Sequence, residues 1–308
     1  NPRIQALSLS AVLAIKLREP GRALADGREA VALARALGDA EILRQTLNDF
    51  GVVLLGVDAL AEAVRVYEEV LAINRARFGE QHQKTATALG ALARAYRRVG
   101  DLPRAEQAAR AALAIDRAIY PGDDRRTALH LNALMKVLDA AGDVPAALGV
   151  AREALRINRG VLGDDHPETL NAVAGVAALE VERGAPASAV ALLGAAVPRA
   201  EARFGPGHWS TAGLRADFGN ALAQDGHAAT GIAQLERAIA DLDALAGSDP
   251  DLLASALAQR CRLALSSRDV ATATRMLARL QQLAPAAPPS RASWAGNLDT
   301  LRGALQML

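Results

Sequence analysis

Gly163-Asp164-Asp165-His166-Pro167-Glu168-Thr169 is the stretch that decides the fold, because versions of it recur along the chain at a fixed spacing. Residues 79–85 read Gly-Glu-Gln-His-Gln-Lys-Thr, residues 205–211 read Gly-Pro-Gly-His-Trp-Ser-Thr, and residues 121–127 hold a degenerate copy. The threonines at 85, 127, 169 and 211 are therefore 42 residues apart. A constant period of this length is typical of a solenoid, in which each unit buries its apolar face only against its neighbours.

Two further positions repeat with the same period. The first is a glycine that ends a helix in the left-handed conformation, present as Gly100, Gly142, Gly184 and Gly226, with Asp58 and Arg268 in the outlying copies. Five residues later comes a small side chain, which allows two helices to cross closely: Ala63, Ala105, Ala147, Ala189, Gly231 and Ala273. The turn therefore joins two closely packed helices in each copy.

Apolar residues before the turn have helical spacing. Leu89, Leu92, Ala93 and Tyr96 are offset by 3, 4 and 7 residues, which is the buried stripe of a helix. A second helix runs from the turn to the next Gly-x-x-His loop. We predict an all-α chain.

This pattern resembles the tetratricopeptide repeat, in the 42-residue form found in kinesin light chain, over essentially the whole chain. The resemblance implies a right-handed superhelical solenoid of about seven helix-turn-helix units. We place them near 1–42, 43–84, 85–126, 127–168, 169–210, 211–252 and 253–292. A Pro/Ala-rich stretch at 284–289 then precedes an expected C-terminal capping helix over 293–308.

Three charged residues depart from the repeat pattern. Glu180, Arg215 and Arg260 occupy positions that are apolar in the other copies. We therefore expect looser packing in the last repeats, or another surface that covers these side chains, such as a second copy of the chain.

Composition excludes several classes of protein. Hydrophobic residues make up 51% and aromatic residues 3%, which suits closely packed Ala/Leu helices. Because the net charge is only +1, we predict that the chain does not bind nucleic acid. The sequence contains no run of 18 apolar residues, so we also predict that it does not insert into a membrane. Cys261 is the single cysteine, which we place in the core of a cytoplasmic protein.

Because the chain starts at Asn1 without Met, we expect it to be a piece of a longer protein.

Catalytic groups do not converge in this pattern. His82, His166 and His208 share one loop position with Asp124 and Pro250, so they lie one repeat apart and we assign them to loop structure. The pairs Asp123-Asp124 and Asp164-Asp165 precede helices, where carboxylates cap free N–H groups. We predict no enzymatic activity, no cofactor and no metal in this chain, although a catalytic domain could precede it.

The resemblance implies that the first helix of each pair lines a concave groove. Asparagines along such a groove hold an extended peptide backbone, and Arg94, Arg97 and Lys136 suit an acidic or phosphorylated segment. The competing interpretation is an ordinary solvated helix face. The candidate groove residues are Asn48, Arg94, Arg97, Asn132, Lys136, Asn171, Asn220 and Arg262.

We therefore predict a non-catalytic scaffold or regulatory region that binds a protein or peptide. The repeat style resembles the C-terminal repeat regions of bacterial serine/threonine kinases, which implies a larger bacterial signalling protein. Two alternatives stay open: the effector-sensing arm of a transcriptional regulator, and a self-assembly module that forms homo-oligomers.

Overall fold

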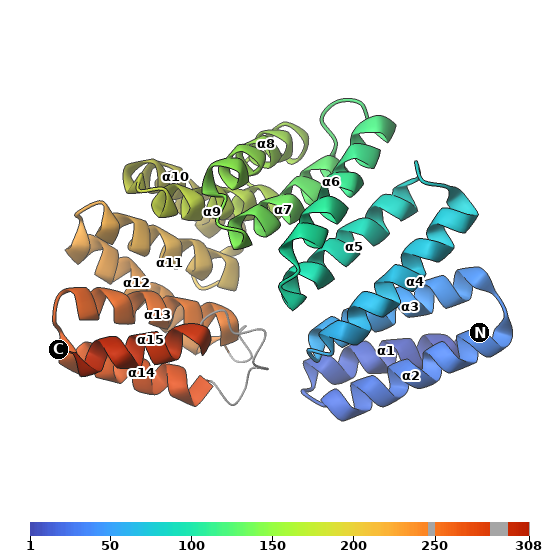
Figure 1. Ribbon diagram of the computed structural model, residues 1–308. Helices are drawn as coiled ribbons and strands as arrows, with labels where there is room; N and C mark the ends of the chain where they lie inside the picture. The colour runs from blue at the N-terminus through green and yellow to red at the C-terminus, as the bar shows by residue number, and fades with distance from the viewer. Residues whose placement is uncertain (246–249, 284–294, 308) are drawn as a thin grey trace. The chain divides into compact units, whose positions relative to one another are not determined.

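The protein is helical throughout the part of the chain that the structure describes. The computed structural model describes residues 1–245, 250–283 and 295–307. These residues form fifteen helices and no strand (Figure 1). The first helices of successive pairs are α1 (Pro2–Lys16), α3 (Ala40–Gly56), α5 (Gln83–Val99), α7 (Arg125–Ala140), α9 (Pro167–Glu182), α11 (Trp209–Gln224) and α13 (Pro250–Ser266). The second helices are α2 (Pro20–Leu37), α4 (Leu60–Phe78), α6 (Leu102–Ile119), α8 (Val144–Leu162), α10 (Pro186–Phe204), α12 (Ala228–Ala244) and α14 (Val270–Leu283), and α15 (Ala295–Gln306) follows.

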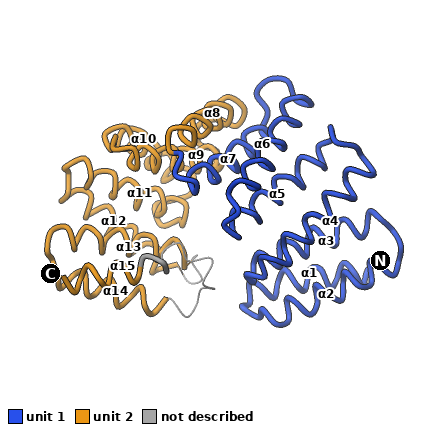
Figure 2. The backbone as a smooth tube through the Cα atoms, in the orientation of Figure 1, with its two compact units in different colours: residues 1–143 blue, residues 144–308 orange. Residues whose placement is uncertain are grey.

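Two compact units divide the chain. Unit 1 covers residues 1–143 with α1–α7, and unit 2 covers residues 144–308 with α8–α15 (Figure 2). The division falls between the two helices of the predicted repeat 127–168. No helix among the described residues is long and apolar enough to cross a membrane.

Packing within each unit follows the repeat. Each helix packs against the next one along the chain, and first helices of neighbouring repeats also touch, as α1 with α3 and α9 with α11. The expected capping helix is confirmed: α15 packs against α13 and α14 and buries Leu301. The Pro/Ala-rich stretch at 284–289 lies outside the described residues.

The predicted turn position is left-handed in every copy. Gly100 has φ 89° and Gly226 has φ 90°, and Asp58 and Arg268 adopt φ 68° and 57° without being glycine. A residue in the left-handed conformation therefore ends the first helix of each pair and lets the chain reverse direction, as the sequence predicts. The small position five residues later is buried in each copy. A Cβ atom on Gly231 would lie 2.5 Å from the carbonyl oxygen of Gly219, so α11 and α12 require glycine at their closest approach.

The three charged residues in apolar positions are paired within unit 2. The buried guanidinium of Arg215 contacts the carboxylates of Glu201 and Asp241. Glu180 pairs with Arg152 and Arg183, and Arg260 contacts Glu236 at 3.2 Å. These pairs account for the charges without a covering surface, so the residues give no reason to expect a second copy.

Candidate functional site

The repeated histidines cap helices. Nδ1 of His82 accepts the backbone N–H of Lys84 at 3.0 Å, and His166 and His208 accept equivalent bonds at 3.2 Å. In the degenerate copy Asp124 does the same for Arg126 at 2.8 Å. The imidazoles thus satisfy free N–H groups at the starts of α5, α9 and α11, which confirms the structural interpretation of this loop.

The loop threonine is also structural. Thr85 and Thr169 donate their hydroxyls to the carbonyl oxygens of Gly79 and Gly163, each at 2.7 Å. The predicted capping role of Asp164 is wrong: its carboxylate pairs with Arg159 and Arg199, because His166 already occupies the N-cap. The histidine and threonine of the loop motif therefore stabilise the joint between helix pairs.

A group of three cations lies on neighbouring first helices of unit 1. Arg94 and Arg97 come from α5, and Lys136 comes from α7, which packs against α5. Their charges act on one another: desolvation and the positive charges of Arg97 and Arg94 lower the pKa of Lys136. Desolvation also lowers the pKa of Arg97, where Asp139 opposes the effect and Arg94 adds to it. We call Arg94, Arg97 and Lys136 the cationic cluster.

None of these three cations forms an ion pair with a carboxylate of the described residues, since Asp139 acts on Arg97 only at longer range. Other arginines of unit 1 do form such pairs. Arg28 of α2 contacts Glu62 of α4 at 2.8 Å. The cationic cluster is therefore a region of positive charge without a directly paired carboxylate among the described residues, and its electrostatic repulsion favours a bound anion.

A buried tyrosine hydroxyl lies beside the cluster. Tyr67 of α4 packs its ring over Gly51 of α3, and its hydroxyl oxygen is buried without a hydrogen-bond partner among the described residues. Burial raises the pKa of this hydroxyl, the charge of Arg94 lowers it, and the charge of Asp49 raises it. The hydroxyl therefore lies within electrostatic range of both Arg94 and Asp49, on a side chain that is fully buried.

A pocket of about 300 Å³ lies between α1 and α3. Ile4, Leu9, Val12 and Ile42 give it an apolar lining, and Asp49 is one of its polar lining residues. Asp49 is also one of the groups whose charge acts on Tyr67.

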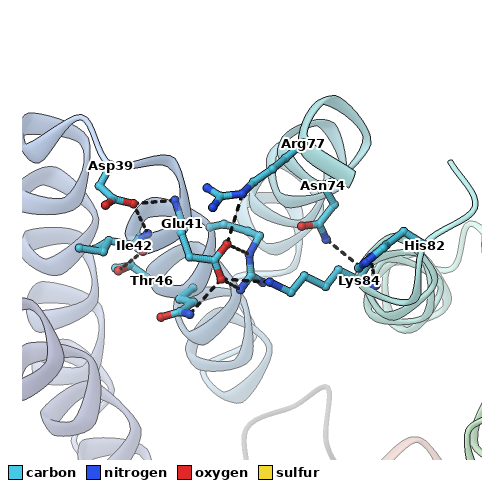
Figure 3. Close-up of polar contacts among 10 residues, drawn as sticks. Asp39, Glu41, Ile42, Thr46, Asn74, Arg77, His82 and Lys84 are labelled. Carbon is cyan, nitrogen blue, oxygen red and sulfur yellow. Dashed lines mark hydrogen bonds and ion pairs between the residues drawn. The ribbon is translucent and has the colours of Figure 1, made fainter. Parts of the chain in front are cut away.

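An ion cluster ties α3 to the helices that follow it. Figure 3 shows Arg77 of α4 and Lys84 of α5 directed toward Glu41 of α3. Lys84 Nζ lies 3.2 Å from Glu41 Oε1, and Arg44 contacts the same carboxylate at 2.6 Å. The hydrogen bond from Arg44, with further hydrogen bonds from Lys84 and Gln45, lowers the pKa of Glu41 to about 2 despite desolvation. Through the Lys84–Glu41 pair this cluster links α3, which carries Asp49, to α5, which carries Arg94.

The remaining candidate residues are dispersed. Asn48 is half-buried on α3 and hydrogen bonds to the neighbouring Asp49, and Asn132 is half-buried on α7. Asn171, Asn220 and Arg262 lie in unit 2 on three different helices, and Asn220 accepts a hydrogen bond from Gln224 of its own helix. The structure thus brings together Arg94, Arg97 and Lys136. Sequence reasoning missed Tyr67, because it comes from a second helix.

Comparison with known proteins identifies the repeat. Tetratricopeptide repeat families match residues 45–118 and 127–168. No curated protein matches the chain. Among solved structures, a tetratricopeptide repeat protein from Parabacteroides merdae is 15% identical with a TM-score of 0.65, over 99% of this chain and 100% of that chain.

Two further structures link the fold to kinesin light chain. The nearly identical TPR-like repeats of a putative kinesin light chain from Podosopora anserina are 21% identical with a TM-score of 0.59, over 64% of this chain and 93% of theirs. BtubC (BKLC) from P. vanneervenii is 16% identical with a TM-score of 0.57, over 75% of this chain and 90% of its own. These likenesses show the fold. The described residues thus form an all-helical solenoid with the tetratricopeptide fold, and two segments of the chain match tetratricopeptide repeat families.

Proposed function

We propose that this chain binds a protein partner by holding an extended acidic segment on the first helices of unit 1. The observation that carries the proposal is the cationic cluster, whose three charges lie close enough to repel one another and have no carboxylate in ion-pair contact among the described residues. Carboxylates or a phosphate would relieve this repulsion and form charge-assisted hydrogen bonds with the two guanidinium groups.

The surroundings favour a peptide over a free anion. The half-buried Asn132 on α7 offers an amide for a peptide backbone. The pocket between α1 and α3 has room for an apolar side chain next to Asp49. The proposed ligand is therefore an acidic segment that also carries an apolar residue.

The test is the binding of a fluorescein-labelled Glu-rich peptide, measured by fluorescence anisotropy at low salt. We expect the double variant Arg94→Glu/Lys136→Glu to weaken binding by about tenfold or more, since close charge pairs at interfaces carry large coupling energies. The matched control is Lys16→Glu/Arg65→Glu, which makes the same change in net charge at two other exposed positions of unit 1. Equal weakening by both variants would show non-specific charge attraction and reject the site.

We further propose that the chain serves as a scaffold or regulatory region of a larger bacterial signalling protein, such as a serine/threonine kinase. The support is the resemblance of the repeat style described above. Reading the coding sequence upstream of Asn1 tests this: a kinase domain there would support it, and a DNA-binding domain would favour the transcriptional-regulator alternative.

A further inference from the structure

A second polar site lies on the first helices of unit 2. Asp217 of α11 and Gln259 of α13 face each other, with Gln259 Nε2 donating to Asp217 Oδ1 at 3.4 Å. The side chain of Gln259 is 8% exposed, and its Oε1 atom is buried without a hydrogen-bond partner among the described residues. The pair therefore presents a carboxylate and an orphaned amide oxygen, both of which accept hydrogen bonds.

No cation of the described residues pairs with Asp217. The helices packed against α11 are α9, α10, α12 and α13, and their charged side chains near the core are engaged with other groups. Arg262 acts on the thiol of Cys261, and it is not among the groups that influence Asp217. The engaged pairs are Glu180 with Arg152 and Arg183, Arg215 with Glu201 and Asp241, and Arg260 with Glu236.

The repeat does not need these polar groups for packing. The equivalent position holds Asp49 in one other copy but Ala91, Ala133 and Gly175 in three, so neighbouring first helices can pack there with small side chains. Desolvation raises the pKa of Asp217 to about 6, which the hydrogen bond from Gln259 only partly opposes. A desolvated carboxylate without a counter-ion destabilises the fold, and groups of this kind are typical of binding sites.

We propose that Asp217 and Gln259 form a binding site for a positively charged side chain, Arg or Lys, of a protein ligand. A guanidinium carries several donors in one plane, so it can donate to the Asp217 carboxylate and to Gln259 Oε1 together. Binding would supply both missing partners, the charge for Asp217 and the donor for Gln259. This site does not rest on the proposed function, because it lies in the other unit and selects the opposite charge.

The site has a pH dependence of defined sign. The ionised carboxylate binds the cation, and protonation of Asp217 abolishes the attraction. Because the pKa lies near 6, we expect affinity for a cationic group to fall about tenfold between about pH 7 and pH 5. An ordinary exposed aspartate would stay ionised over this range.

The experiment measures anisotropy of a fluorescein-labelled Arg/Gly peptide, with a citrulline/Gly peptide as the uncharged match. Asp217→Asn should weaken binding of the Arg peptide about tenfold or more, and Gln259→Leu several-fold, whereas neither should change binding of the citrulline peptide. Asp243→Asn is the control, since it removes the same charge from a carboxylate that pairs with Arg279. Circular dichroism spectra confirm that each variant is folded.

Three results would overturn the inference. One is no binding of the Arg peptide by the wild-type chain. A second is equal weakening by Asp217→Asn and Asp243→Asn, which would indicate a diffuse field. The third is Asp217-dependent binding of free spermidine without binding of the peptide, which would make the ligand a small amine. Loss of Arg-peptide binding in the Arg94→Glu/Lys136→Glu variant is not expected, so the two sites are tested separately.

Discussion

Oδ2 of the buried Asp116 lies 2.6 Å from Nδ1 of His130, and this pair replaces an asparagine that other repeats use. At the equivalent positions Asn74 donates to the carbonyl oxygen of Lys84 at 2.7 Å, and Asn158 donates to that of Glu168 at 3.3 Å. The Asp116–His130 contact joins α6 to α7, as each of these asparagines joins the second helix of its repeat to the next first helix.

The neighbouring helix is adapted to this histidine. A Cβ atom on Gly90 of α5 would lie 2.9 Å from His130 Nε2, so a larger residue there would displace the ring. In the copies that carry asparagine, Ala88 and Ala172 stand where His130 does. Asp116, His130 and Gly90 therefore form one local substitution of the repeat pattern.

We predict that His130→Ala destabilises the protein by about 2–4 kcal/mol, because it leaves a buried carboxylate without a donor. The double variant Asp116→Asn/His130→Ala restores the combination found at Asn74 and Ala88 and should recover most of the loss. Urea unfolding followed by circular dichroism measures both. A double variant as unstable as the single one would contradict this account.

The loop threonines provide a matched pair of variants. Thr169→Val removes the hydroxyl that bonds to the Gly163 carbonyl and should cost about 1 kcal/mol. The hydroxyl of Thr127 is buried without a partner, so Thr127→Val should be neutral or stabilising. Thermal unfolding of the two variants checks the difference, and equal losses would show that the hydroxyl bond is unimportant.

Acid stability should depend on Glu41. Its pKa is about 2 in the folded state and about 4.5 when unperturbed, so its contribution is complete above about pH 4.5 and is lost as the pH falls toward 2. Allowing for solvent screening, we expect Glu41→Gln to cost about 1–2 kcal/mol at pH 7 and nothing near pH 2. Unfolding midpoints across this range test the prediction. Glu80→Gln, which removes a more exposed partner of Arg75, is the control and should change stability little.

Asp217 should have the opposite effect on stability. Its folded pKa of about 6 lies above the ordinary 3.8, so the ionised group destabilises the fold above about pH 6, and this penalty disappears as the pH falls toward 3.8. Asp217→Asn should therefore raise the free energy of unfolding by about 2 kcal/mol at neutral pH and by little near pH 4. Thermal unfolding at both pH values measures this, and a variant less stable than wild type at pH 7 would contradict it.

The sequence by itself determined the helix pairs, the left-handed turns and the repeated loops that join the pairs. These features depend on residues close together in the chain, such as Gly100 at a helix end or His166 two residues before the N–H that it accepts. It also identified Arg94, Arg97 and Lys136 as a candidate set, because a fixed period places equivalent residues on equivalent helix faces.

Only the tertiary structure decided how the unusual polar residues are satisfied. Arg215 meets Glu201 and Asp241, and Asp217 meets Gln259, across helices that the period places side by side but whose side-chain contacts it does not specify. The period fixes which helices neighbour each other, since each repeat packs only on the next. Whether a buried charge has a partner depends on how far the side chains of the two helices extend and on how deeply they are buried. Both are set only when the chain is folded.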